Sequence, residues 1–113
     1  MKYSVSSIIN IDNSENELWR LITSPGHLNF VHPFCKSNKP INWGNDENKK
    51  DYLIYLNGLK YYRDFFKWEE KKGFELWIGK KNGKKSLVKW QIINNFDELK
   101  LKITVYPYKT SKI

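Results

Sequence analysis

Arginine, cysteine and long apolar runs are all scarce in this chain of 113 residues. Arg20 and Arg63 are the only arginines among 20 basic residues, although the formal net charge is +8. The planar guanidinium is the side chain best suited to phosphate and guanine, so its scarcity argues against a nucleic-acid surface. Lysine pairs flank the turn-forming residues Gly73 and Asn82-Gly83, and hairpin turns at opposite ends of a sheet would disperse their charge. We therefore expect no nucleic-acid partner.

Cysteine occurs once, as Cys35, which excludes an internal disulfide and a cysteine-based zinc site. We expect it to be a small buried or half-buried side chain. The two histidines, His27 and His32, do not show the His-Glu-x-x-His spacing of a zinc site. A glycine-rich phosphate loop and a nucleophile elbow are also missing, so we expect neither a metal nor a cofactor.

No apolar run approaches the roughly 20 residues that a membrane span requires. The first residues lead directly into alternating sequence rather than into the apolar core of a signal peptide, so we expect a cytoplasmic location. With 40% apolar and 16% aromatic residues the chain can bury a core, but it is too short for two ordinary domains. We expect a single domain over residues 1–113.

Periodicity in the first third predicts a strand followed by two short helices. Apolar and polar residues alternate over 3–11, as in a half-buried strand. Ser14 and Glu17 have the spacing of a capping box, which predicts a helix whose apolar stripe lies within 18–22. A second short helix is predicted from Ser24 and Pro25 as cap and first turn, with Pro33 as its terminator.

The remainder of the chain is typical of an antiparallel meander. Residues 34–51 are irregular and predict one strand at best. Strands separated by glycine- and asparagine-rich turns are then predicted at 52–57, 59–69, 74–78, 87–93 and 99–106. The last of these alternates cleanly, with Leu99, Leu101, Ile103 and Val105 on one side. The expected fold class is α+β.

These features resemble the START-like helix-grip superfamily, which includes polyketide cyclase/dehydrase-like and birch-pollen-allergen-like proteins. The resemblance covers almost the whole chain and rests on the order of elements, on residues 17–28 (ELWRLITSPGHL), on Pro33 and on Trp90 in a late strand. It is moderately specific for fold. It is not specific for function, because these residues are packing residues and the superfamily has many functions.

The resemblance implies a curved antiparallel sheet of six to seven strands that wraps around a long C-terminal helix and encloses a ligand cavity. A helix that spans a domain of ~30 Å needs about 20 residues, and too few follow Pro107, so we expect this helix to be absent. The chain is then truncated, or a neighbouring chain covers the sheet, or the sheet collapses on itself. Monomers rarely tolerate a large exposed apolar face, so we favour self-association as a homodimer.

Alternation in 59–69 separates Tyr62, Asp64, Phe66 and Trp68 from a second set that carries more charge. We therefore predict that the first set points inward, with Asp64 as the one carboxylate on an aromatic wall. Burial would raise the pKa of such a carboxyl, which could then orient or deprotonate a ligand hydroxyl. The alternative is a surface pair of Asp64 with Arg63 or a neighbouring lysine, and a register error of one residue would exchange the two faces.

Histidine supplies a second candidate. His32 lies where this fold class has its cavity mouth, so its imidazole could hydrogen-bond a ligand or act as a base. The alternative is a histidine that faces solvent. His27 is expected at the surface. The apolar wall beneath the missing helix, and hence the ligand-binding set, is predicted to comprise Ile54, Leu56, Tyr62, Phe66, Trp68, Val88, Trp90, Leu101 and Ile103, with Ile92 and Val105 beside them.

The function predicted from these observations is non-enzymatic binding of a hydrophobic small molecule or lipid on the concave face of the sheet. One alternative is a cyclase/dehydrase-type enzyme that acts on an aromatic or polyketide-like substrate, with Asp64, Tyr62 or His32 as acid–base groups. The other is an interaction module whose open groove accepts a helix of a partner protein.

Overall fold

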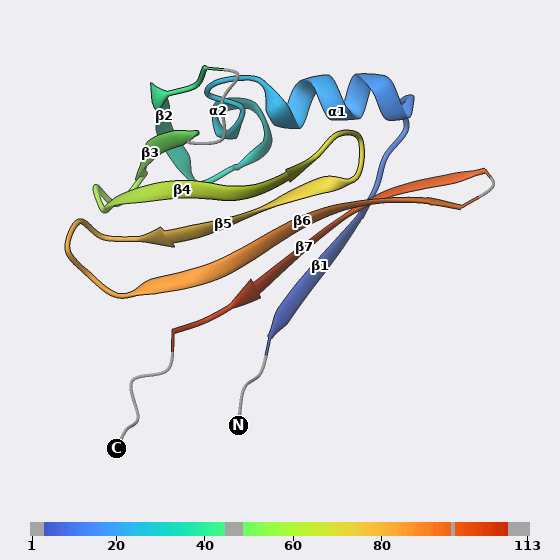
Figure 1. Cartoon of the computed structure of the whole chain (residues 1–113). Helices are drawn as coiled ribbons and strands as arrows, with labels where there is room; N and C mark the ends of the chain where they lie inside the picture. The colour runs from blue at the N-terminus through green and yellow to red at the C-terminus, as the bar shows by residue number, and fades with distance from the viewer. Residues whose placement is uncertain (1–3, 45–48, 96, 109–113) are drawn as a thin grey trace.

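The computed structural model describes residues 4–44, 49–95 and 97–108, and Figure 1 shows their arrangement. In chain order the elements are β1 (Val5–Asn10), α1 (Glu15–Thr23), α2 (Leu28–Val31), β2 (Cys35–Asn42), β3 (Lys50–Tyr55), β4 (Lys60–Glu69), β5 (Gly73–Gly79), β6 (Lys85–Asn95) and β7 (Glu98–Tyr106). They form one seven-stranded sheet in the order β1-β7-β6-β5-β4-β3-β2, with every neighbouring pair antiparallel. The predicted α+β order is confirmed.

The segment predicted to be irregular is more regular than expected. Residues 34–51 contain all of β2 and the start of β3, and the pairing of these strands is interrupted by two register shifts. Such irregular pairing removes the strict alternation from which a strand is recognised in sequence. Tyr3, Phe96 and residues 109–113 fall outside the described residues.

Capping residues determine where the two helices begin. Ser14 and Glu17 form the predicted capping box at the start of α1: the Glu17 amide donates to Oγ of Ser14, and the Ser14 amide donates to the Glu17 carboxylate. Ser24, predicted as the cap of the second helix, instead ends α1, because its hydroxyl donates to the Leu21 carbonyl over 2.8 Å. The second helix therefore starts late, after His27, and has only four residues.

Both helices lie on the same side of the sheet (Figure 1). We call this side the inner face and the opposite side the outer face. The core lies between the helices and the inner face, and consists of Leu18, Ile22, Leu28, Leu53, Phe65, Phe74, Leu76, Val88, Trp90 and Leu101. Rings of three adjacent strands stack across it, with centroids 5.0 Å apart for Trp68 and Phe74 and 5.3 Å apart for Phe74 and Trp90.

The inner face is covered unevenly. Near β4 and β5 its side chains are buried beneath the helices, whereas Val5 and Ile9 on the edge strand β1 are 57% and 46% exposed. The side chains of Leu99, Leu101, Ile103 and Val105 share this inner face, as the alternation in 99–106 predicts, and Leu101 alone is fully buried. Neither helix in the described ranges is long and apolar enough to cross a membrane.

Candidate functional site

A buried ion pair lies on the inner face of β3 and β4. Asp51 and Arg63 are direct partners in the antiparallel register. The guanidinium binds the carboxylate with two hydrogen bonds, Nε to Oδ1 over 2.8 Å and Nη2 to Oδ2 over 2.6 Å. Asp51 is 0% and Arg63 3% exposed, so the pair is almost entirely removed from water. A buried pair of this kind requires good geometry, because the desolvation of both charges opposes their attraction.

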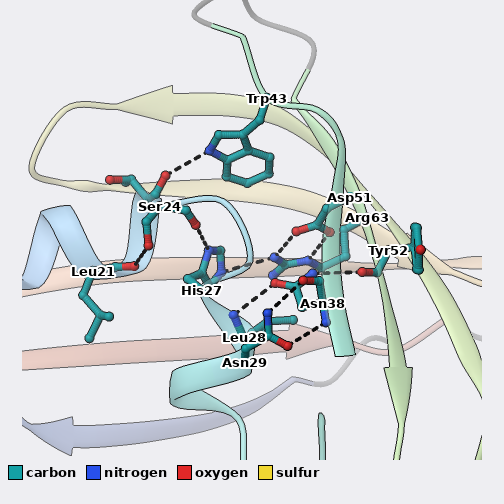
Figure 2. A network of polar contacts seen from close by, with 11 residues as sticks. Leu21, Ser24, His27, Leu28, Asn29, Asn38, Trp43, Asp51, Tyr52 and Arg63 are labelled. Carbon is teal, nitrogen blue, oxygen red and sulfur yellow. Dashed lines mark hydrogen bonds and ion pairs between the residues drawn. The ribbon is translucent and has the colours of Figure 1, made fainter. Parts of the chain in front are cut away.

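His27 extends the ion pair into a network of three side chains (Figure 2). Its Nδ1 lies 3.1 Å from the Ser24 carbonyl oxygen, which only accepts, so Nδ1 carries the hydrogen and Nε2 is free to accept. Nη2 of Arg63 donates to that Nε2 over 3.2 Å. Burial, and then the nearby Arg63 charge, lower the pKa of His27 to about 3, so the imidazole is neutral near neutral pH.

Aromatic rings surround the His27 side of this network. The His27 ring packs against Trp43, Phe74 and Trp90, with centroid distances between 5.4 and 6.2 Å. Trp43 is fixed in turn by its indole N–H, which donates to the Thr23 carbonyl over 3.0 Å (Figure 2). The low polarity of this environment strengthens each polar contact and makes an unpaired polar group costly.

Asn38 attaches α2 to the sheet beside the ion pair. Its Oδ1 accepts from the Leu28 amide over 3.0 Å, and its Nδ2 donates to the Tyr52 carbonyl over 2.9 Å (Figure 2). Gly26 allows this close approach: its φ is +74°, and a Cβ there would lie 3.1 Å from the Asn38 carbonyl oxygen. The four-residue helix is therefore fixed to the sheet by hydrogen bonds of side-chain amides.

An open groove of about 370 Å³ adjoins the network. One wall comes from β1, β6 and β7 and is apolar except for Ser7, with Ile9, Val88, Ile103 and Val105. The other wall comes from α2, the segment after it, β3 and β4, and contributes Val31, His32, Phe34, Tyr55 and Arg63. Phe34 at the rim is 64% exposed.

Arg63 and His32 present donors to the groove, whereas the hydroxyls of Ser7 and Tyr55 both donate and accept. Nδ1 of His32 accepts from the Phe34 amide over 3.1 Å, so the neutral ring carries its hydrogen on Nε2. Burial, with a smaller effect of Arg63, lowers the pKa of His32, and burial raises the pKa of Tyr55. Both side chains are therefore neutral near pH 7. Asp51 does not line the groove, since its carboxylate is covered by Arg63 and the core.

The predicted inward face of β4 is wrong for three of its four residues. Asp64 pairs with Lys50 of the neighbouring strand over 3.7 Å on the outer face, and the two side chains are 43% and 53% exposed, so the alternative of a surface pair with a lysine is confirmed. Phe66 stacks on Trp77 on this same face, with centroids 5.3 Å apart, and Tyr62 lies opposite Tyr52 there. The faces were assigned by taking the set with more charged residues as the surface set. This failed because Arg63, counted as a surface charge, is neutralised by Asp51 in the interior.

Trp68 does point inward, because a β-bulge between Phe65 and Lys67 shifts the register. After this bulge Trp68 contacts the rings of Trp19 and Phe74 in the core. A single extra residue on one strand moves all later side chains to the other face, which regular alternation does not anticipate.

The remaining predicted residues divide between the two faces. Val88, Trp90 and Ile103 line the groove, and Leu101 is buried on the inner face. Ile54 and Leu56 do not belong to this wall: Ile54 alternates with the inward Leu53, and Leu56 is 63% exposed. His32, for which the sequence left open a ligand contact or a solvent-facing ring, is half-buried and lines the groove, and Cys35 is half-buried as expected.

His27 was predicted at the surface and is instead fully buried, and the role of Arg63 was missed entirely. The hairpin explains the second error. A two-residue turn at Asn57-Gly58 would place Asp51 opposite Asp64, whereas the longer observed loop places Asp51 opposite Arg63. The sequence did contain a signal for the observed register. It pairs Asp51 with the opposite charge of Arg63, whereas the two-residue turn would pair it with Asp64, and like charges that face each other destabilise a strand pair. The described residues contain no group of three or more potential metal ligands.

Comparison with known proteins gives structural similarity only. No family model matches the sequence, and no curated protein is significantly similar to it. An uncharacterized protein from Bacillus thuringiensis superposes with a TM-score of 0.77 at 14% identity, covering 97% of this chain and 82% of that one. CalU16 from Micromonospora echinospora gives 0.67 at 14% identity, over 96% of this chain and 63% of CalU16.

A START superfamily protein from Mycobacterium smegmatis is also similar, with a TM-score of 0.71 at 13% identity over 91% of this chain and 74% of that chain. At such identities the likeness concerns the fold and not the ligand or the activity. The seven-stranded antiparallel sheet with two short helices after its first strand is thus a START-like fold, consistent with the helix-grip arrangement.

Proposed function

We propose that this chain binds an apolar small molecule or lipid in the groove between α2 and the strands β1, β6 and β7. The observation that supports this most strongly is the groove itself, an apolar hollow of about 370 Å³ in a START-like fold. Small-molecule sites are typically concave and largely apolar, with a few polar groups that orient the ligand. The groove has this composition, since Arg63, His32 and Tyr55 are grouped on one wall.

The floor of the groove is preorganised. Leu53, Leu76 and Trp90 line it, are 0%, 1% and 6% exposed and belong to the hydrophobic core. A ligand would therefore bind to side chains that are already fixed, and it would remove exposed apolar atoms of the open wall from water.

The cyclase/dehydrase alternative is less well supported. Of its three acid–base candidates, Asp64 and Tyr62 lie on the outer face, and only His32 lines the groove. Binding without chemistry requires no such pair of groups, so we favour it.

The test uses N-phenyl-naphthylamine, a neutral apolar dye whose fluorescence rises when it leaves water. Ile9 and Ile8 are neighbours on β1, 46% and 58% exposed, and only Ile9 lines the groove. Ile9→Lys should weaken dye binding at least about tenfold, because it places a charge on an apolar wall. Ile8→Lys adds the same charge on the outer face and should leave binding unchanged.

Equal binding by both variants would place the dye elsewhere, and absence of binding to the unmodified chain would contradict the proposal. Native mass spectrometry of the purified chain adds a second measurement. A co-purified apolar adduct supports the proposal, whereas a ligand-free dimer that does not bind the dye supports self-association through the groove.

A further inference from the structure

Among the residues that the structure describes, the hydrogen bonds of Arg63 leave one of its nitrogens without a partner. A guanidinium has five N–H groups, one on Nε and two on each Nη. The Nε hydrogen and one Nη2 hydrogen go to Asp51, and Nη2 also donates to His27. Within residues 4–44, 49–95 and 97–108, no group accepts from Nη1.

This unpaired nitrogen belongs to a residue that is only 3% exposed and yet lines the groove. Buried donors without a partner are costly, and they are satisfied by protein, water or ligand. Asp51 and His27 also hold the guanidinium in place from two sides, so Nη1 cannot turn to another acceptor without breaking their bonds. A ligand that brings an acceptor to Nη1 would complete a site that is already oriented.

Charge and hydrogen-bonding capacity restrict the acceptor. Asp51 already neutralises Arg63, so a ligand carboxylate would bring an uncompensated negative charge into a buried site. A hydroxyl also has to place its own hydrogen, for which the groove lining offers the hydroxyl oxygens of Tyr55 and Ser7, whereas Nη1 of Arg63 and Nε2 of His32 only donate. A carbonyl oxygen accepts two hydrogen bonds and has no hydrogen to place.

We propose that the groove selects apolar molecules bearing a neutral carbonyl oxygen, as in a ketone or ester, which accepts hydrogen bonds from Nη1 of Arg63. This rests on the proposed binding function of the groove and specifies its ligand class. Asp51 and His27 act as positioning residues that direct Nη1, and the apolar wall of β6 and β7 receives the rest of the molecule.

Four probes of nearly equal size separate the chemistries: methyl β-naphthyl ketone, the secondary alcohol formed by its reduction, β-naphthoate and β-isopropylnaphthalene. Calorimetry gives an association constant for each. We expect the ketone to bind more tightly than the alcohol and the carboxylate. The hydrocarbon reports the apolar contribution of the groove alone.

The variant must remove Arg63 without leaving Asp51 as an unpaired buried charge. Asp51→Leu combined with Arg63→Met removes both charges at similar volume, a replacement that buried pairs often tolerate. In this double variant the ratio of ketone to hydrocarbon association constants should fall about tenfold, the amount expected for one hydrogen bond to a charged donor. Circular dichroism confirms that the variant is folded.

An unchanged ratio of ketone to hydrocarbon association constants in the double variant would show that Arg63 does not bind the carbonyl oxygen. Tighter binding of naphthoate or of the alcohol to the unmodified chain would also overturn the proposal. In either case the hydrocarbon still binds and the groove remains a binding site. If none of the four probes binds, the proposed function fails together with the inference.

Discussion

Two ion pairs cross the same pair of strands at adjacent register positions, one on each face of the sheet. Asp51 and Arg63 meet on the inner face at 2.6 Å, with 0% and 3% of their side chains exposed. Lys50 and Asp64 meet on the outer face at 3.7 Å, with 53% and 43% exposed. The residues are chemically similar, so the difference between the pairs is one of environment.

The comparison shows that position relative to the helices decides what a charge can do. On the outer face water solvates both partners, and such pairs contribute about 0–1 kcal/mol to stability. On the inner face the same attraction acts at low polarity, but each charge then depends on its partner. Of the two pairs, only the inner one contributes a residue, Arg63, to the lining of the groove.

The largest expected effect comes from breaking the inner pair. Asp51→Asn leaves the Arg63 charge buried without its counterion, so we expect the free energy of unfolding to fall by about 3–5 kcal/mol. Urea denaturation measures this. The Asp51→Leu, Arg63→Met double variant should recover part of the loss, because it removes both charges but leaves Nε2 of His27 without its donor. If Asp51→Asn costs less than about 1 kcal/mol, water reaches the pair and the contrast between the faces is wrong.

The second-largest loss of stability is expected when a buried leucine is truncated, and an exposed leucine serves for comparison. Leu53 is 0% exposed on the inner face, and Leu56, three residues later, is 63% exposed. Leu53→Ala should cost about 2–5 kcal/mol, because it removes core contacts and leaves a cavity. Leu56→Ala should change stability by about 0.5 kcal/mol or less. Similar midpoints of thermal unfolding for the two variants would contradict the burial of Leu53 on the inner face.

Acid should weaken the network through His27. The pKa of His27 falls from 6.5 in the unfolded chain to about 3 in the fold, so the unfolded state binds more protons between these values. His27 therefore contributes stability that is complete above pH 6.5 and is lost as the pH falls toward 3, at no more than about 1.4 kcal/mol per pH unit.

The matched control is His27→Gln, which retains an acceptor but does not titrate. Its stability should depend less on pH than that of the unmodified chain, so the gap between the two should narrow as acid is added. Chemical denaturation between about pH 7 and 5 avoids most carboxylate titration. Parallel pH profiles for the two proteins would show that His27 is not buried as a neutral base.

The smallest effect is expected on the outer face. Asp64→Asn removes the partner of Lys50 but leaves both groups in water, so stability should change by less than about 1 kcal/mol. Binding of the naphthyl probes should be unaffected. A loss of binding in this variant would restore Asp64 as a site residue and would reverse the comparison between the faces.

Most of the fold could be predicted from the sequence because its signals are local. The capping box at Ser14 and Glu17 and the alternation in 99–106 each depend on neighbouring residues, and both are confirmed. Residues 34–51 were under-predicted because register shifts disrupt their alternation. The late start of α2 was missed because Ser24 can cap either helix, and the backbone around Gly26 decides which.

The candidate site could be predicted only in part. Alternation correctly grouped Val88 with Trp90, since these residues share one strand. It failed on β4, where the choice of face depended on the partner strand and on a bulge after Phe65. It also failed for His27, whose burial results from contacts with β4, β5 and β6.

By itself the sequence determined the order of elements, because helix caps, turns and alternation act between residues that are close in the chain. Tertiary structure alone decided which carboxylate is buried and where the free guanidinium nitrogen lies. Asp51, Arg63 and His27 are brought together by strand register and by the docking of α2 through Asn38. These contacts join residues that are distant in sequence, and moving one strand by a single residue would undo them.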